Sequence, residues 1–593
     1  MDSEIDFTVP KSLIPLGHRK RSHPAERDRS ALFFACAERS RSIRITSPNG
    51  SSRPPDGERK DPFRSSCENI SAHIHTVFHV PMVLPREDHN MKARLLSIVV
   101  LLRWTLVTLI CTTLVLLWVR FTLIPQHRTD IAGAELNVIY GVQKVMLGFP
   151  LYEDPEQPPF DIIQYTPLYY WICGGLGSLL QIDPYDSYRI FLLSRILSLA
   201  LNLLTVLLVF RTAKLAGAGR WSVWAALLAF TAFTQHFFSR SDALYALLFA
   251  ATIHGFVQWT RTVPEGKTRM LAITGVCAVL CFMAKQTGIL ILCLIPFHLL
   301  LARQWKSLSI YSVSVVIASV ASLLIILSTT SLNFFLKNTV QGLMNGTSDR
   351  LLLILLEPHR YIYFIGWHLA SVLLVIPFMR QQDPVLRFFG MALPLSLFYS
   401  VATALKMGSD LNYFYEDLVL VFLALSIALG QEEQRIPIVD APRPCLRTGL
   451  RIAFAVYGIG FAVHQTRAYW DWSGQYGTPE SRFAAYQADL HVRDVLKNEM
   501  GLRPEDKVFI TYRGHLEHLL IGQGLLTQKD IIEWSEVVPF DLTRFDRAMV
   551  DGTVRFVITD TPMDTVPFMG RAYTGFHRVR QVDDRYIMAR NTP

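Results

Sequence analysis

The residues of this chain that could do chemistry are polar groups placed beside long apolar segments. The stretch from Asp130 to Trp171 is the one long segment among the hydrophobic ones that mixes carboxylates, aromatic residues and prolines. A carboxylate can accept a proton from a reacting group, and a cation can neutralise the charge that develops on one. We therefore interpret residues 130–171 as the catalytic loop of a membrane enzyme. Three more polar motifs accompany it: SRSD at Ser239–Asp242, AKQTG at Ala284–Gly288 and KMGSDLNYFYE at Lys406–Glu416.

The loop has two halves with different expected structures. Its first half repeats apolar residues every three or four positions and ends at Gly148 and Pro150, which predicts a helix lying on a membrane surface. Its second half, 152–159, is too rich in proline and acid for regular structure. It leads into the Gly-rich run 166–180, which is too short to cross a bilayer comfortably.

Composition places the whole chain among polytopic membrane proteins. Of its 593 residues, 51% are hydrophobic and 18% charged, and the mean hydropathy is +0.27. Apolar runs of about 20 residues recur between Leu95 and His464, which excludes a soluble globular protein. The net charge of +9 comes largely from short loops, where it sets orientation and does not indicate nucleic acid. Several of the eight cysteines lie in apolar runs, so we expect no disulfide framework.

The positive-inside rule orients the spans consistently only if 166–180 stays on the outer face. The basic loop with Arg211, Lys214 and Arg220 then lies inside. The N-terminus is predicted inside, and the polar motifs, the first loop (120–189) and the C-terminus outside. About eleven spans are expected, at 96–119, 190–210, 221–238, 243–259, 270–284, 287–302, 308–329, 360–379, 388–405, 412–430 and 448–464.

The two ends of the chain differ from the membrane part, 91–466. Residues 1–90 are basic, rich in Arg, Ser and Pro, and read as disordered. MKARLL at Met91 resembles an ordinary start, so a misplaced start codon is our hypothesis for 1–90, against a regulatory cytoplasmic tail. Residues 467–593 alternate strand-like segments at Lys507, Val554 and Tyr586 with a helical one at Gly514, which predicts a small α/β extracytoplasmic domain.

These motifs together resemble a known family. An acidic residue soon after the first span, then G-x-P-L-Y-x-D, Y-x-P-L-Y-Y and an outer R-S-D, is similar to the polyprenyl-phosphate-sugar-dependent GT-C glycosyltransferases. The protein O-mannosyltransferase and aminoarabinose-transferase branch is the nearest in pattern, and KMGSDLNYFYE looks like the motif that opens a late helix in bacterial members. The resemblance covers roughly 95–590 and implies a GT-C-like fold in a bacterial inner membrane.

The resemblance also implies a reaction and roles for residues. A sugar would move from a polyprenyl-phosphate donor to a hydroxyl of a glycan, lipid or protein acceptor on the extracytoplasmic face. The catalytic Asp of the family's first loop carries over to Asp130, with Glu135 nearby, but the adjacent Asp-Glu pair is absent, so either could be the base. Asp242 is a third candidate catalytic acid. Candidates for holding the donor phosphate are Arg240, Lys285 and Lys406; candidates for holding sugar hydroxyls are Tyr165, Gln286, Asn412 and Glu416.

Each candidate also has an ordinary structural explanation. Asp130 could be a helix N-cap, and Asp242 could lie in the first turn of its helix simply because the helix dipole stabilises an acid there. Arg240 could be an interfacial anchor, whereas Lys285 lies inside a long apolar stretch, where an unneeded lysine is costly. His515 and His518 are three residues apart on a predicted helix, but the sequence offers no third metal ligand near them. We therefore expect both to be surface residues and expect no metal site there. Whether a divalent ion is needed stays open.

A membrane transporter or lipid-linked sugar flippase is the alternative function. Such proteins show internal repeats and broken helices with charges near the midplane. This sequence shows no repeat, and its unusual charges collect at one face. A purely structural membrane protein would leave the clustered acids and cations unexplained. The glycosyltransferase is therefore the favoured prediction.

Overall fold

The structure is a computed structural model of the chain. It describes residues 89–129, 131, 135–233, 238–344, 346, 358–406, 411–433, 444–474, 478–525, 540–563, 565–568 and 571–590. The N-terminal tail, and with it the hypothesis of a misplaced start codon, lies outside the described residues. The proposed boundary at residue 466 falls inside a helix that runs on to Gly474, and the division into domains stays a prediction.

Each of the eleven predicted spans coincides with helix. These helices are α2 (His89–Leu123), α5 (Ser187–Leu215), α6 (Trp221–Phe233), α7 (Ser241–Arg261), α8 (Pro264–Ala284), α9 (Ile289–Leu301), α10 (Trp305–Leu327), α13 (Pro358–Met379), α14 (Pro384–Ala404), α15 (Tyr415–Glu433) and α16 (Pro444–Gly474). Among the described residues, six are long and apolar enough to cross a membrane: α2 from Val100, α5, α7, α8, α10 and α14. The chain is thus an integral membrane protein, and the number of spans stays a prediction.

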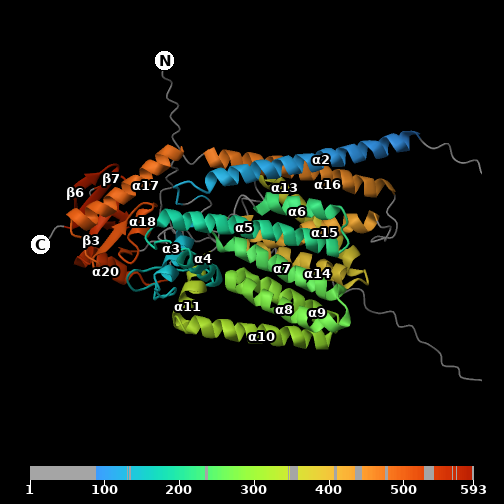
Figure 1. The fold of residues 1–593 in the computed structure, drawn as a ribbon, viewed down its shortest axis with the longest axis horizontal. Helices are drawn as coiled ribbons and strands as arrows, with labels where there is room; N and C mark the ends of the chain where they lie inside the picture. Colours follow the sequence, from blue (N-terminus) through green and yellow to red (C-terminus); the bar gives the residue numbers. More distant parts are fainter. Residues whose placement is uncertain are drawn as a thin grey trace, which may run out of the picture. The chain divides into compact units, whose positions relative to one another are not determined.

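Helices α5, α7 and α8 lie side by side at the centre of the bundle (Figure 1). Small residues permit this close packing, as they do between membrane helices generally. A Cβ added to Gly255 of α7 would stand 2.6 Å from Oγ1 of Thr274 in α8. By contrast, only Tyr311 and Ile326 of α10 are buried, so much of its apolar surface is exposed, as expected for a helix that faces lipid.

The chain reverses between α8 and α9 through the short 3-10 helix η1 (Gln286–Gly288). Lys285 is in extended conformation and ends α8. Gly288 makes the reversal possible, because a Cβ there would lie 2.4 Å from the backbone nitrogen of Phe282. The tight turn at Gly288 therefore places Lys285 directly after the last residue of α8.

The first loop contains α3 (Glu135–Met146) and α4 (Leu168–Leu179). Our expectation that its first half lies on a membrane surface is wrong, because every residue from Glu135 to Lys144 is buried. Helix α4 spans about 18 Å, too short for a hydrocarbon core of about 30 Å. The acidic segment between them packs on α11 (Leu332–Thr339) and η2 (Gln341–Leu343), where the amide of Ile163 donates to Oδ1 of Asn338 at 2.8 Å.

The C-terminal region is a small α/β unit, as predicted. Its helices are α17 (Pro479–Asp494), η4 (Val495–Glu499), α18 (Leu516–Leu519) and α20 (Thr543–Asp551). Five strands form one sheet in the order β2-β1-β3-β7-β6. They are β1 (Lys507–Ile510), β2 (Gly524–Leu525), β3 (Val554–Thr559), β6 (Phe576–Val582) and β7 (Arg585–Arg590). A separate two-stranded sheet pairs β4 (Val566–Phe568) with β5 (Arg571–Tyr573). Strand β1 runs parallel to β2 and β3, whereas β7 is antiparallel to β3 and β6. Between its two ends, β6 exposes all five side chains, from His577 to Gln581.

Candidate active site at one end of the helices

Three charged side chains meet where α7 begins and α8 ends. Arg240 precedes α7 and Asp242 lies in its first turn, while Lys285 follows the last residue of α8. Because α7 and α8 are consecutive and packed together, the start of one lies beside the end of the other. Nε of Arg240 donates to Oδ2 of Asp242 at 3.0 Å, and Nζ of Lys285 donates to Oδ1 at 2.7 Å. We call Arg240, Asp242 and Lys285 the ion cluster.

Both cations of the ion cluster stay charged. Burial alone would lower the pKa of Lys285, but the carboxylate of Asp242 and then Tyr413 and Tyr165 outweigh burial, and the pKa lies above its usual range. The pKa of Arg240 is raised in the same way, by Asp242 and by the hydroxyl of Tyr165, against burial. Two cations thus share one carboxylate, and the ion cluster by itself carries a net positive charge.

Aromatic rings and two further predicted residues, Lys406 and Glu416, lie near the ion cluster. Nζ of Lys285 lies 4.7 Å from the ring centre of Tyr413 and 5.9 Å from that of Tyr245. Lys406, which follows α14, is close enough that burial and the charge of Lys285 lower its pKa to about 8. Glu416 occupies the first turn of α15 and is 4% exposed, and among the described residues its Oε2 has no hydrogen-bond partner.

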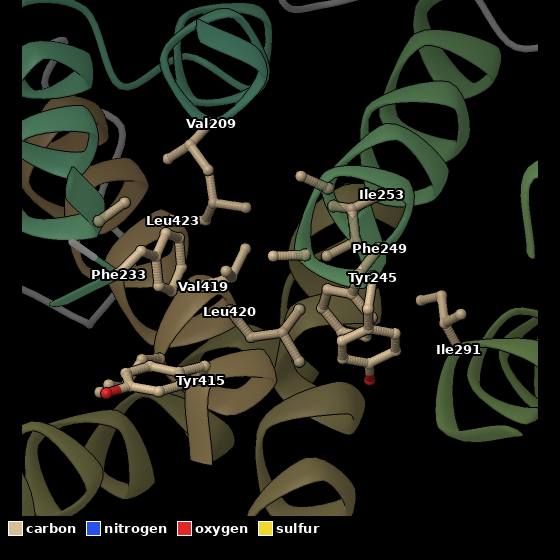
Figure 2. Close-up of a cluster of buried hydrophobic side chains, with 14 of the residues drawn as sticks. Val209, Phe233, Tyr245, Phe249, Ile253, Ile291, Tyr415, Val419, Leu420 and Leu423 are labelled. Atoms are coloured by element: carbon tan, nitrogen blue, oxygen red, sulfur yellow. The ribbon is translucent and has the colours of Figure 1, made fainter. Parts of the chain in front are cut away.

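A small, narrow pocket lies beside these charges, and the surface that it presents is almost entirely apolar. Its lining residues are Asp242, Tyr245, Ala246, Phe249, Tyr415, Glu416 and Val419. Figure 2 shows Tyr245 and Phe249 of α7 facing the α15 residues Val419 and Leu420 across the buried apolar core. The pocket is therefore mainly apolar, with Glu416 and Tyr245 among the residues at its border.

A second buried ion pair lies in the first loop. Glu135 and Arg195 of α5 are both 0% exposed, and Nη2 of Arg195 stands 3.1 Å from Oε2 of Glu135. The backbone amide of Ile131 also donates to Oε2 at 2.6 Å, and that of Ser239 to Oε1 at 3.1 Å. Burial would raise the pKa of Glu135, but Arg195 and the two amides lower it overall, so it stays ionised. We call Glu135 and Arg195 the loop anchor.

Arg195 uses its remaining donors on the backbone that follows α2. Its guanidinium donates to the carbonyl oxygen of Ile124 at 3.3 Å, to that of Gln126 at 2.7 Å and to that of Arg128. Asp130 itself lies outside the described residues. The chain on both sides of it is nevertheless held by the loop anchor. Through Ser239 the same anchor reaches the segment that leads into the ion cluster.

The remaining predicted site residues are placed differently. Nε2 of Gln286 donates to the carbonyl oxygens of Gln164 and Thr339, so Gln286 ties η1 to the first loop and to α11. Asn412 belongs to η3 (Leu411–Phe414), but its side chain lies outside what the structure describes. Among the described residues no group of three or more His, Cys, Asp or Glu side chains could hold a metal ion, so metal dependence stays open.

His515 and His518 are buried, and our expectation of surface residues is wrong. They are 2% and 1% exposed because α18 docks against α3 and α5. Burial lowers the pKa of each to about 3, so both are neutral at pH 7.

Sequence reasoning missed two residues of this region. Arg195 could have been found, because an arginine within an apolar span is costly unless it has a partner. Tyr245 gave no such signal, since aromatic residues are common in membrane helices.

Comparison with known proteins was made by sequence and by structure. No protein-family model and no curated protein matches the sequence. The structure is similar to that of ArnT from Cupriavidus metallidurans bound to undecaprenyl phosphate, with a TM-score of 0.51 and 13% identity over 81% of this chain and 97% of ArnT. The chain therefore has the fold of ArnT, and the predicted fold class is confirmed except for the number of spans.

Two further similar structures have lower scores. ArnT in the apo state gives a TM-score of 0.49 at 15% identity, over 81% of this chain and 97% of that one. The apo oligosaccharyltransferase of Archaeoglobus fulgidus gives 0.49 at 15% identity, over 78% of this chain and 70% of its own.

Proposed function

We propose that this protein transfers a sugar from a polyprenyl-phosphate donor to a hydroxyl of a glycan, lipid or protein acceptor. The observation that carries this proposal is the charge of the ion cluster: Arg240 and Lys285 share the one carboxylate of Asp242, and Lys406 lies near enough to Lys285 to feel its charge. A bound phosphate would supply the missing negative charge. The fold is that of ArnT, whose structure contains undecaprenyl phosphate.

The proposed reaction is a substitution at the anomeric carbon of the sugar. The acceptor oxygen forms a bond to this carbon, and the bond from the carbon to the donor phosphate oxygen breaks. The electron pair of the broken bond stays on the phosphate, and the acceptor's proton passes to a carboxylate. A well-placed general base contributes about 10²- to 10⁴-fold in rate. Asp130 is our candidate for this base.

The surroundings of the two other acids suggest different roles for them. Glu135 accepts from Arg195 and from two backbone amides, so we assign it the positioning of the segment around Asp130. Asp242 accepts hydrogen bonds from Arg240 and Lys285, so we assign it the role of orienting these two cations toward the phosphate. Glu416 and Tyr245 line the pocket beside the ion cluster, and we assign them contacts with the hydroxyls of the sugar.

The test is sugar transfer in liposomes that contain the full chain. A panel of polyprenyl-phosphate sugars labelled in the sugar is offered with hydroxyl-bearing acceptors, and a comparison of lipid-linked glycans with and without the gene product names the donor. The expected result is labelled acceptor and free polyprenyl phosphate. Movement of intact donor across the bilayer, with no bond broken, would establish the transporter and overturn this proposal.

We also propose that the site and the C-terminal region face the outside of a bacterial inner membrane. In a variant without the native cysteines, a cysteine at the exposed position Ser481 should react with an impermeant thiol reagent added outside. A cysteine in the loop 431–447 should not react. Reversed labelling would put the ion cluster on the cytoplasmic face and end the proposal of an extracytoplasmic reaction.

A further inference from the structure

The segment that precedes Asp130 is held from two directions. From α5, the guanidinium of Arg195 binds three of its carbonyl oxygens, those of Ile124, Gln126 and Arg128. From the C-terminal region, Nε2 of His515 lies 2.6 Å from the carbonyl oxygen of His127. Residues that are 388 positions apart in the sequence thus meet three residues before the proposed base.

The tautomer of His515 follows from its partners. A carbonyl oxygen can only accept, so Nε2 carries the proton. Nδ1 is then an acceptor, and the hydroxyl of Ser187 donates to it at 2.8 Å. Ser187 begins α5, the helix that also carries Arg195, and it is fully buried. The neutral imidazole therefore bridges the start of α5 and the backbone of the first loop.

The neighbouring histidine docks the same short helix on α3. Nδ1 of His518 donates to Oε1 of Gln143 at 2.6 Å, and Nε2 of Gln143 donates back to the carbonyl oxygen of His518 at 3.1 Å. The ring of Phe191 lies edge-on to both imidazoles, with ring centres 5.4 Å from His515 and 5.3 Å from His518. The two histidines are thus matched in burial and neighbours, but only His515 reaches the loop backbone.

Helix α18 is fixed within its own domain as well. The amide of Leu516 donates to Oδ2 of the buried Asp489 in α17 at 3.2 Å, and the hydroxyl of Tyr512 donates to Oδ1 at 2.8 Å. Arg585 of β7 lies 3.4 Å from the same carboxylate. Asp489 therefore ties His515, through its helix, to the α/β unit.

We propose that His515 is a positioning residue of the transferase, through which the C-terminal domain sets the backbone that leads into Asp130. This inference rests on the proposed function. It makes the C-terminal domain a part of the apparatus that positions the proposed base. A backbone displaced by about 1 Å can cost about 10²-fold in rate.

The test compares three variants of the full chain. His515→Leu removes both hydrogen bonds, His515→Gln restores a donor toward the carbonyl oxygen of His127, and His518→Leu is the matched control. We expect His515→Leu to lower kcat by roughly 10- to 100-fold with the donor KM unchanged within about twofold. We expect His515→Gln to recover most of kcat, and His518→Leu to lose similar thermal stability but little kcat.

A second measurement does not depend on activity. Hydrogen exchange of the peptide that covers 124–131 should become faster in His515→Leu and stay unchanged in His518→Leu. Unchanged exchange in His515→Leu, or equal loss of kcat in the Leu variants of both histidines, would overturn the inference. If exchange responds as expected while the wild-type protein transfers no sugar, the positioning contact stands and the proposed function fails.

Discussion

The loop anchor and the ion cluster contain the same kinds of side chains, yet they differ in how far their charges are satisfied. In the loop anchor, Glu135 accepts from Arg195 and from two backbone amides, and Arg195 donates its remaining hydrogens to carbonyl oxygens. In the ion cluster, one carboxylate serves two cations, and Lys406 lies near enough to Lys285 to feel its charge. The loop anchor is thus a balanced pair of one acid and one base, whereas the ion cluster carries an excess of positive charge that an anionic ligand could balance.

The largest effect is expected from breaking the loop anchor. Glu135→Gln leaves Arg195 buried without its counter-charge, which typically costs about 3–5 kcal/mol of folding free energy. We expect the variant to be recovered in much lower yield and to melt at lower temperature. Activity lost from a variant with unchanged melting would instead make Glu135 a chemical participant.

A double variant separates the two roles of the loop anchor. Glu135→Leu with Arg195→Met replaces the buried pair by apolar side chains, a change that is often neutral for stability. Folding should then return only in part, because the backbone groups that the pair bound are left unpaired. Turnover should stay low, because the carbonyl oxygens of the first loop have lost their donors. Recovery of both would show that the loop does not depend on the anchor.

The next effect concerns the proposed base, which belongs to neither cluster. Asp130→Asn should lower turnover by at least about 10²-fold, the lower end for a proton transfer, with folding and membrane insertion intact. Turnover kinetics and thermal melting of the same preparation provide the check. Normal turnover would remove Asp130 from the mechanism and return Glu135 as the candidate.

A smaller effect is expected from the ion cluster. Lys285→Gln and Lys406→Gln should each lower donor affinity or turnover roughly 10- to 150-fold, through loss of a charge-assisted contact of about 1.5–3 kcal/mol. The double variant should lose less than the sum of the two singles, because both groups would hold one phosphate. Arginine at either position should rescue only in part, since its planar fork does not reproduce an ammonium.

A matched control for these lysines lies in α11. Lys337 pairs with Asp154 and Glu156 away from the ion cluster, so Lys337→Gln removes a paired lysine without removing a phosphate contact. Its donor kinetics should equal those of the wild type. If instead both single variants of the site keep normal donor kinetics, the phosphate is held elsewhere, and Arg240 is the next residue to test.

The smallest effect is a pH dependence. Burial and Lys285 lower the pKa of Lys406 to about 8, so Lys406 is charged at pH 7 and mostly neutral at pH 9. If its charge holds the donor, donor KM should rise roughly tenfold between these pH values. Lys406→Arg stays charged throughout and should flatten this profile. A profile that is the same in both proteins would exclude Lys406 as its source.

Sequence reasoning succeeded where the membrane limits the alternatives. Apolar runs located the helices, and the distribution of basic loops put Arg240, Lys285 and Lys406 at one end of the bundle before any contact was known. The structure brings Arg240 and Lys285 onto the carboxylate of Asp242. Within the segment 166–180 the structure has only the short helix α4, which is too short to cross a membrane. The orientation from the positive-inside rule required that this segment not cross.

The sequence could not show which groups are buried by partners far along the chain. The repeat in α3 indicates one apolar face, but Gln143 on that helix is buried by His518, 375 positions away. Likewise nothing local distinguishes the three-residue spacing of His515 and His518 from that of a surface helix. The burial of α3 and the burial of the two histidines both result from the packing of the C-terminal region on the first loop. Such packing leaves no periodic pattern in either segment of the sequence.

The five-stranded sheet of the C-terminal region ends on one side in β6, which exposes Arg578 and Arg580 together with His577. A second copy that paired with this edge, strand against strand, would bring like charges together, and charged edge strands are a usual protection against such pairing. We therefore expect this edge to resist pairing between copies, even at the high local concentrations reached when a membrane protein is overproduced.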